Sequence, residues 1–185
     1  MVSYGGPSGR QHFLTHEPID TERLQFVTPH DELDKWKSTQ WYREDQYIYP
    51  LHAEQLVKWM DAGGRLGLGS HGEVQGVGTH WELWMMAAGG MDEHDALRMA
   101  TRHSAEAIGL GGDIGSLEVG KLADLQVLDS NPLVDLRNTT DLRYVMKNGR
   151  LYEARTLTEV WPRQRALPTQ WWWRLEPPDV PVPGR

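Results

Sequence analysis

The sequence contains no cysteine, which excludes disulfide bonds and any metal site built on thiolate ligands. A metal ion would have to be held by histidine and carboxylate side chains. The sequence also lacks an apolar run near the roughly 20 residues that a membrane-spanning helix needs. Its first residues, MVSYGGPSGR, do not have the basic-then-apolar order of a signal peptide. The default expectation is a cytoplasmic protein, although a parent chain could carry an export signal.

Clusters of basic residues are missing as well. The 19 lysines and arginines are scattered among 26 aspartates and glutamates, and the net charge is −7. Binding to nucleic acid without sequence preference needs clustered positive charge, so neither nucleic acid nor a membrane is an expected partner. The motifs H-x-H, H-E-x-x-H, G-x-S-x-G and the P-loop are absent too, so no short motif alone assigns a reaction.

The sequence does contain enough apolar residues to fold, at 39% of its 185 residues. It also has nine tryptophans against only two phenylalanines. Because tryptophan buries a large area, we expect these side chains in cores and contacts. The run Trp171-Trp172-Trp173 stands beside proline-rich sequence, and we expect it to pack on a neighbouring surface rather than to form an independent element.

Apolar spacing and glycine pairs predict three helices, over residues 51–62, 79–88 and 92–108. Pro50 suits the first turn of the first helix, where its missing N–H costs nothing. In the second helix the sequence Thr79-His80-Trp81-Glu82 fits a capping box, with Thr79 as the N-cap residue.

Two regions predict strands. Residues 65–69 form a short apolar run between glycines, which favours a strand before the second helix. From Ile114 the segments GSLEVGKLADLQVLDSNP and LRYVMKNGRLY read as strands, the latter being a hairpin that turns at Asn148-Gly149. Helices followed by short strands predict an α/β layer with a small sheet appended to it.

His71 is the first candidate site residue because it directly follows the predicted strand 65–69. In parallel α/β folds, ligands and catalytic groups collect at this carboxyl end. His80 lies at the start of the next helix, where the helix dipole disfavours a charged imidazole. A neutral imidazole can bind a metal or act as a base. The competing interpretation is that His71 is a hydrogen-bonded loop residue and that Glu73 lies in a solvated loop.

Four stretches resemble the carboxyl-terminal part of the amidohydrolase superfamily, in the branch of imidazolonepropionase-like and prolidase-like enzymes, which includes members fused to a β-propeller. They are GGRLGLGSHGEVQGVGTHWELWMMAAGGM, ALRMATRHSAEAIGL, GDIGSLEVGKLADLQVLDSNPLVDLRN and YVMKNGRLY. The resemblance implies an α/β fold, with the last strands and helices of a (β/α)₈ TIM-type barrel followed by part of a small β-sandwich. It implies residues 1–112 for the barrel part, 113–155 for the sandwich part and 156–185 for a Trp/Pro-rich tail.

The same resemblance implies a metal-dependent hydrolase that attacks an amide-type carbon–nitrogen bond of a small molecule or dipeptide. Such enzymes use water activated by one or two divalent ions, often Zn²⁺. His71 stands where the family usually has an aspartate, so it is the candidate metal ligand and catalytic residue. His80 and Glu73 are candidates for substrate contact. The other metal ligands of the family lie on earlier strands, which have no counterpart in these residues.

The lack of counterparts for the family's other metal ligands leaves three interpretations of the chain. The chain is a portion of a metal-dependent amidohydrolase that is active only with a missing amino-terminal portion. Alternatively, it is a non-catalytic binding or assembly module, a homo-oligomer that associates through exposed sheet edges. The third interpretation is a truncated reading frame without a function of its own.

Overall fold

The computed structural model describes residues 9–16, 21–37, 42–69 and 76–173. Among the described residues three short helices come first, and eight further helical elements follow. The helices and turns are α1 (Gly9–His16), α2 (Thr21–Val27), α3 (His30–Lys37), η1 (Glu44–Gln46), α4 (Tyr49–Asp61), α5 (Gly78–Ala88), α6 (Glu93–Arg98), η2 (Met99–His103), α7 (Ser104–Ala107), η3 (Leu136–Thr140) and η4 (Trp171–Trp173). The strands are β1 (Leu125–Leu128), β2 (Leu142–Lys147), β3 (Arg150–Glu153) and β4 (Glu159–Trp161).

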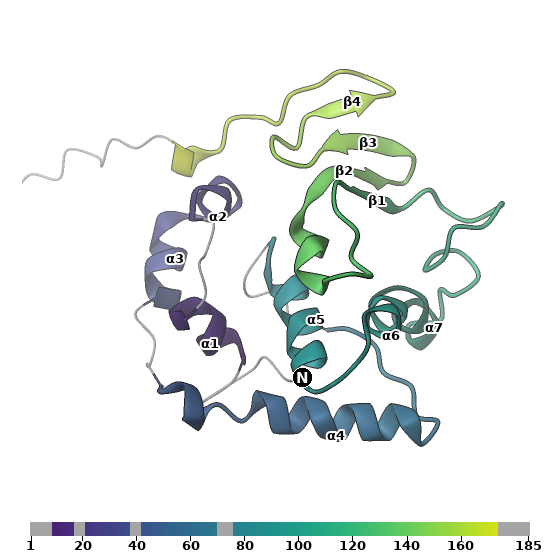
Figure 1. Ribbon diagram of the computed structural model, residues 1–185. Helices are drawn as coiled ribbons and strands as arrows, with labels where there is room; N and C mark the ends of the chain where they lie inside the picture. Colours follow the sequence, from purple (N-terminus) through teal and green to yellow (C-terminus); the bar gives the residue numbers. More distant parts are fainter. Residues whose placement is uncertain (1–8, 17–20, 38–41, 70–75, 174–185) are drawn as a thin grey trace, which may run out of the picture.

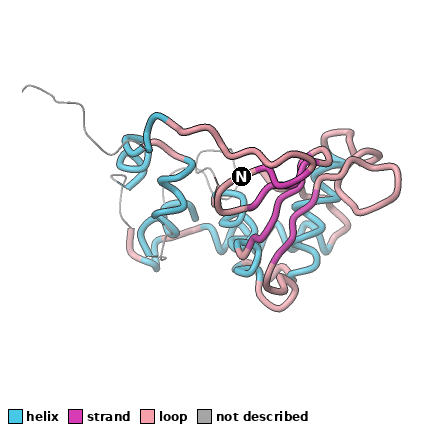
Figure 2. Tube along the Cα trace, turned by 90° about the horizontal axis from the view of Figure 1, so that it is seen from above, coloured by secondary structure: helices cyan, strands magenta, loops and turns pink. Residues whose placement is uncertain are grey.

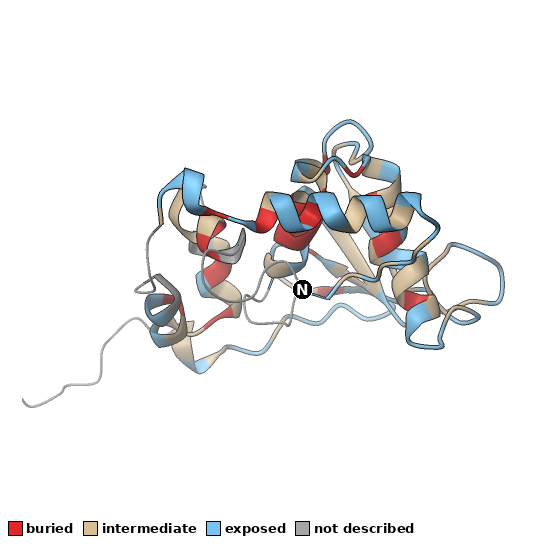
Figure 3. Cartoon of the chain, turned by 90° about the horizontal axis from the view of Figure 1, so that it is seen from below, coloured by how far each residue is buried: buried red, intermediate tan, exposed pale blue. Residues whose placement is uncertain are grey.

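Helix α5 is the centre of the molecule and packs against α1, α4, α6 and η3 (Figure 1). Most of its residues are apolar, and its buried side chains join the main hydrophobic core. Seen from above, α1–α3 and the sheet occupy different sides of the molecule (Figure 2). Buried residues gather on the inward sides of the helices, while the outward face of α4 is exposed (Figure 3). The core therefore packs the helices, and Leu136 of η3 between β1 and β2, around one helix.

Helix α4 confirms the first predicted helix. It runs over Tyr49–Asp61 with Pro50 in its first turn. Ala53 is fully buried against α5, and Gly63 adopts a φ of +90° just after the helix ends. A methyl group at Gly89 would lie 2.4 Å from the carbonyl carbon of Ala53, so the end of α5 approaches the α4 backbone closely. Glycine is required here for helix packing, while the next residue, Gly90, adopts a φ of +93° just after α5 ends.

The third predicted helix is confirmed as one helical stretch with a π turn inside it. It begins after Asp92, whose carboxylate accepts a hydrogen bond from the backbone N–H of Asp95 at 2.8 Å. The π turn Met99–His103 separates α6 from α7. The hydroxyl of Ser104 donates to the carbonyl of Met99 at 2.7 Å and accepts from the N–H of Leu68 at 2.8 Å. This serine ties the helix to the preceding segment.

Two local expectations are wrong. Residues 65–69 have no strand hydrogen bonds, because no described strand lies beside them to form a ladder. Helix α5 begins at Gly78, one residue before Thr79, and its N-cap residue is Val77, which makes no side-chain cap. Since Thr79 lies inside the helix, it does not form the predicted capping box with Glu82.

The four strands form one antiparallel sheet in the order β1-β2-β3-β4. Asn148 and Gly149 join β2 to β3 with φ values of +48° and +74°, as the predicted type I′ turn requires. Strand β4 extends the sheet to Trp161, beyond the residue range predicted for the sandwich part. Within the described ranges no strands pair in parallel, so the partial barrel and the sandwich remain expectations from the resemblance.

The tryptophan run packs as expected. The indole N–H groups of Trp172 and Trp173 both donate to the carbonyl of Phe26 in α2, at 3.3 and 2.8 Å. Trp171 is 70% exposed and lies outside this contact. Among the described helices, none is long and apolar enough to cross a membrane.

Candidate functional site

Of the three predicted site residues, only His80 lies in the described part of the chain. His71 and Glu73 fall within residues 70–75, outside the described residues. Their predicted roles therefore stay predictions. His80 lies in the first turn of α5 and is only 8% exposed. The described parts of the candidate site are therefore His80 and the segment that ends at Gly69, shortly before His71.

His80 is held by a hydrogen-bonded chain that joins α5 to η3. Its Nδ1 lies 3.0 Å from the hydroxyl oxygen of Thr139. That hydroxyl donates to the carbonyl of Leu136 at 2.7 Å, and the indole N–H of Trp84 donates to the same carbonyl at 2.8 Å. Trp84 thus bonds the Leu136 carbonyl directly, and His80, one turn earlier on α5, is linked to the same carbonyl through the Thr139 hydroxyl. The loop between β1 and β2 is fixed against the helix in this way.

His80 is neutral in the folded protein. Burial and, as the smaller cause, the nearby positive charge of Arg23 together lower its pKa from the usual 6.5 to about 4. The guanidinium of Arg23 is itself placed by a hydrogen bond to the carbonyl of Thr140, at 3.2 Å. The expectation of a neutral imidazole is confirmed, with burial rather than the helix dipole as the first cause. Thr139, which sequence reasoning missed, is 59 residues from His80 in the chain and carries no local signal.

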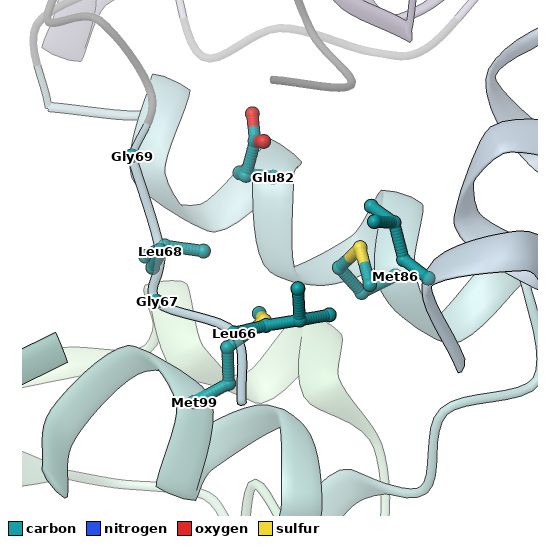
Figure 4. Close-up of a pocket in the computed structure, with 8 residues that line it drawn as sticks. Leu66, Gly67, Leu68, Gly69, Glu82, Met86 and Met99 are labelled. Carbon is teal, nitrogen blue, oxygen red and sulfur yellow. The ribbon is translucent and has the colours of Figure 1, made fainter. Parts of the chain in front are cut away.

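A cavity of about 280 Å³ lies beside the segment that leads to residue 70. Its lining is apolar apart from one carboxylate, and the residues are Leu56, Leu66, Gly67, Leu68, Gly69, Glu82, Met86 and Met99. In Figure 4 the Glu82 carboxylate points away from the side chains of Leu66 and Met99. Glu82 is only 5% exposed. The residue predicted to cap the helix is therefore a buried carboxylate that lines this cavity.

The described residues do not by themselves provide a metal site. No three histidine, aspartate or glutamate side chains among them converge as ligands would. A catalytic zinc normally takes three protein ligands and an open position. A second feature missed from the sequence is the pair His12 and His16, one turn apart on α1 with ring centroids 5.4 Å apart. Tyr47 packs edge-on against both rings, so this pair belongs to an aromatic packing cluster.

Comparison with known proteins identifies the family. The sequence profile of the amidohydrolase family matches residues 51–152, more than half of the chain, and the chain belongs to this family. It is 42% identical to a 5-methylthioadenosine/S-adenosylhomocysteine deaminase of Syntrophobacter fumaroxidans over 33% of this chain and 17% of that protein. It is 49% identical to an imidazolonepropionase of Symbiobacterium thermophilum over 22% of this chain and 10% of that protein.

Two solved structures share the arrangement of these elements. One is a Xaa-Pro dipeptidase with methionine bound in its active site, with a TM-score of 0.53 and 26% identity over 70% of this chain and 33% of that one. The other is molinate hydrolase, with a TM-score of 0.51 and 26% identity over 72% of this chain and 31% of that one. The chain thus spans about a third of each solved structure and less than a fifth of each curated relative.

Proposed function

We propose that this chain is the carboxyl-terminal portion of a hydrolase that acts on an amide-type carbon–nitrogen bond. In this proposal it works only when completed by further residues, in a longer chain or in a separate partner. The observation that carries the proposal is the family match over residues 51–152 in a chain that spans a third of its solved structural relatives. The lack of a three-residue ligand cluster among the described residues agrees with a site that is completed from outside.

The proposed roles follow the position of each residue along the chain. His71 takes the metal-binding and proton-transfer duty that an aspartate has in the family, and His80 and Glu73 contact the substrate. A divalent ion such as Zn²⁺ would be held only with ligands that the described residues do not supply. The names of the relatives point to small amide-type substrates, such as Xaa-Pro dipeptides, as the first class to test.

The proposal is tested by comparing the chain alone with the chain joined to the portion encoded upstream of Met1. We expect metal binding by elemental analysis and hydrolysis of Xaa-Pro dipeptides or N-acyl amino acids only in the joined form. His71→Ala should abolish hydrolysis in that form without unfolding it, whereas His52→Ala, at an exposed position on α4, should not. Stoichiometric metal and turnover in the chain alone would contradict the need for completion. A joined form without metal or activity would contradict the hydrolase.

A second candidate function is a non-catalytic assembly module. It is favoured by strand β1, which is an edge of the sheet and has no described strand along its outer side. At the opposite edge, β4 is partly covered, because Glu159 forms a backbone bridge and an ion pair with Arg165. An open edge offers backbone groups to a second copy of the chain. The molar mass of the chain in solution distinguishes this alternative, which requires an oligomer, from a monomeric portion of an enzyme.

A further inference from the structure

We propose that Thr139 is a positioning residue that holds His80 in a single neutral tautomer, so that Nε2 of His80 accepts a hydrogen bond from an N–H or O–H group of the substrate. This inference rests on the proposed function, in which His80 contacts the substrate. It adds the residue that orients His80 and the chemical class of the group that His80 receives.

The tautomer follows from the positions of three polar atoms. The hydroxyl oxygen of Thr139 lies 2.7 Å from the carbonyl oxygen of Leu136. Two oxygens at this distance need a proton between them, and only the hydroxyl can supply one. The same hydroxyl therefore cannot donate to His80, which lies 3.0 Å away on its other side. His80 must donate instead, so its proton is on Nδ1 and the lone pair is on Nε2.

The environment keeps the ring in this form. His80 is buried in the first turn of α5, and Arg23 adds positive charge nearby. Both effects oppose protonation of Nε2 at neutral pH. A neutral ring nitrogen with a lone pair attracts a hydrogen-bond donor and repels a carboxylate oxygen. The group that His80 receives is accordingly a donor, such as the N–H of an amide, and not an anion.

The positioning residue comes from a different part of the fold. Thr139 belongs to η3, between strands β1 and β2, whereas His80 starts the central helix. The segment between β1 and β2 thus contributes to the site by orienting the His80 side chain and not by contacting the substrate itself. The carbonyl of Leu136 anchors this arrangement, since Trp84 also donates to it.

The test is a long-range ¹H–¹⁵N NMR experiment on the ¹⁵N-labelled chain at pH 7, which reports the protonation of each ring nitrogen. The variant His80→Gln identifies the signals of His80. We expect a protonated Nδ1 and an unprotonated Nε2 in the wild type and in Thr139→Ser, and a mixture of tautomers in Thr139→Val. The matched control is Thr140→Val, because the neighbouring Thr140 hydroxyl donates only to the carbonyl of Arg137 at 3.0 Å. This control should leave the His80 signals unchanged.

The class of ligand is tested on the ¹⁵N-labelled joined form, in which the proposed site is complete, with two small probes of equal size, propionamide and propionate. Addition of propionamide should shift the Nε2 signal of His80, and propionate should not. A wild-type ring protonated on Nε2 would overturn the proposal even if Thr139→Val does not fold. A shift with propionate alone, or with neither probe, would overturn the donor class. None of these readouts needs turnover, so their failure is distinguishable from failure of the proposed hydrolase.

Discussion

The indole of Trp173 stacks on the ring of Phe26, with the two ring centroids 4.6 Å apart and the ring planes inclined by 21°. The indole N–H donates to the backbone carbonyl of the same phenylalanine at 2.8 Å. One residue near the end of the described chain therefore holds α2 by a ring contact and a hydrogen bond together, across 147 positions of sequence. This contact links the segment after the sheet to the amino-terminal helices.

Replacing Trp173 with alanine should lower the free energy of unfolding by about 2 kcal/mol, since one aromatic pair and one hydrogen bond are lost. Trp171→Ala is the matched control, because that side chain is 70% exposed and should change stability little. Urea denaturation followed by circular dichroism measures both values. Equal effects of the two variants would show that the stacking on Phe26 does not stabilise the fold.

The sequence allows prediction where local rules decide the structure. The helix at α4, the helical stretch after Asp92 and the turn at Asn148-Gly149 all follow from spacing, capping and backbone conformation, and the structure confirms them. The predicted strand at residues 65–69 is wrong because a strand depends on a neighbour that the local sequence does not specify. The family was also predicted from four stretches and is confirmed by the profile match.

The candidate site was less accessible to prediction. A neutral His80 was predicted from the helix start, but its burial and its bond to Thr139 depend on packing between segments 59 residues apart. The capping-box motif predicts Glu82 as a cap residue only if the helix begins directly after Thr79. The helix begins at Gly78 instead, so Glu82 does not cap it. Contacts of this kind are set by tertiary structure, and one sequence carries no direct signal for them.

Gly89→Ala should destabilise the protein by about 2 kcal/mol or more, because overpacking forces two backbones apart. The added methyl group would lie 2.4 Å from the carbonyl carbon of Ala53 and 2.6 Å from the backbone nitrogen of Glu54. Gly112→Ala is the control, since a methyl group there meets no atom within 4 Å. Thermal unfolding of both variants checks the prediction. A Gly89→Ala protein as stable as the control would mean that α4 and α5 are further apart than the structure has them.

Val127→Lys tests the assembly alternative at the open edge of the sheet. Val127 in β1 and Val160 in β4 are equally exposed, at 39%, so Val160→Lys is a matched control at the partly covered edge. If copies of the chain associate through β1, a lysine there should weaken association about tenfold or more, and the lysine in β4 should not. Light scattering over a range of concentrations gives the association constants. Equal weakening by both variants would place the contact elsewhere.

The lowered pKa of His80 makes stability depend on pH in a defined window. The unfolded chain takes up a proton near pH 6.5, whereas the folded chain does so only near pH 4, the pKa of buried His80. Between these values the unfolded state binds more protons, so the free energy of unfolding should fall as pH falls, by about 3 kcal/mol in total. The pKa of Glu106 is also lowered from its usual 4.5, first by the hydrogen bond from Arg102. This carboxylate therefore changes the stability near and below pH 4.5, and the change expected at higher pH is assigned to His80.

His80→Gln should remove this slope between pH 6.5 and pH 4.5, because glutamine does not titrate. His52→Gln, which changes an exposed histidine on α4, should keep it. Urea denaturation at pH 7.0, 6.0, 5.0 and 4.5 gives the slope for each protein. We expect a slope on the order of 1.4 kcal/mol per pH unit, which one proton implies, in the wild type and in His52→Gln, and none in His80→Gln. Identical slopes in the wild type and in His80→Gln would mean that folding does not lower the pKa of His80. The ring would then be protonated below its usual pKa of 6.5 and would lose there the lone pair on Nε2 on which the proposed substrate contact depends.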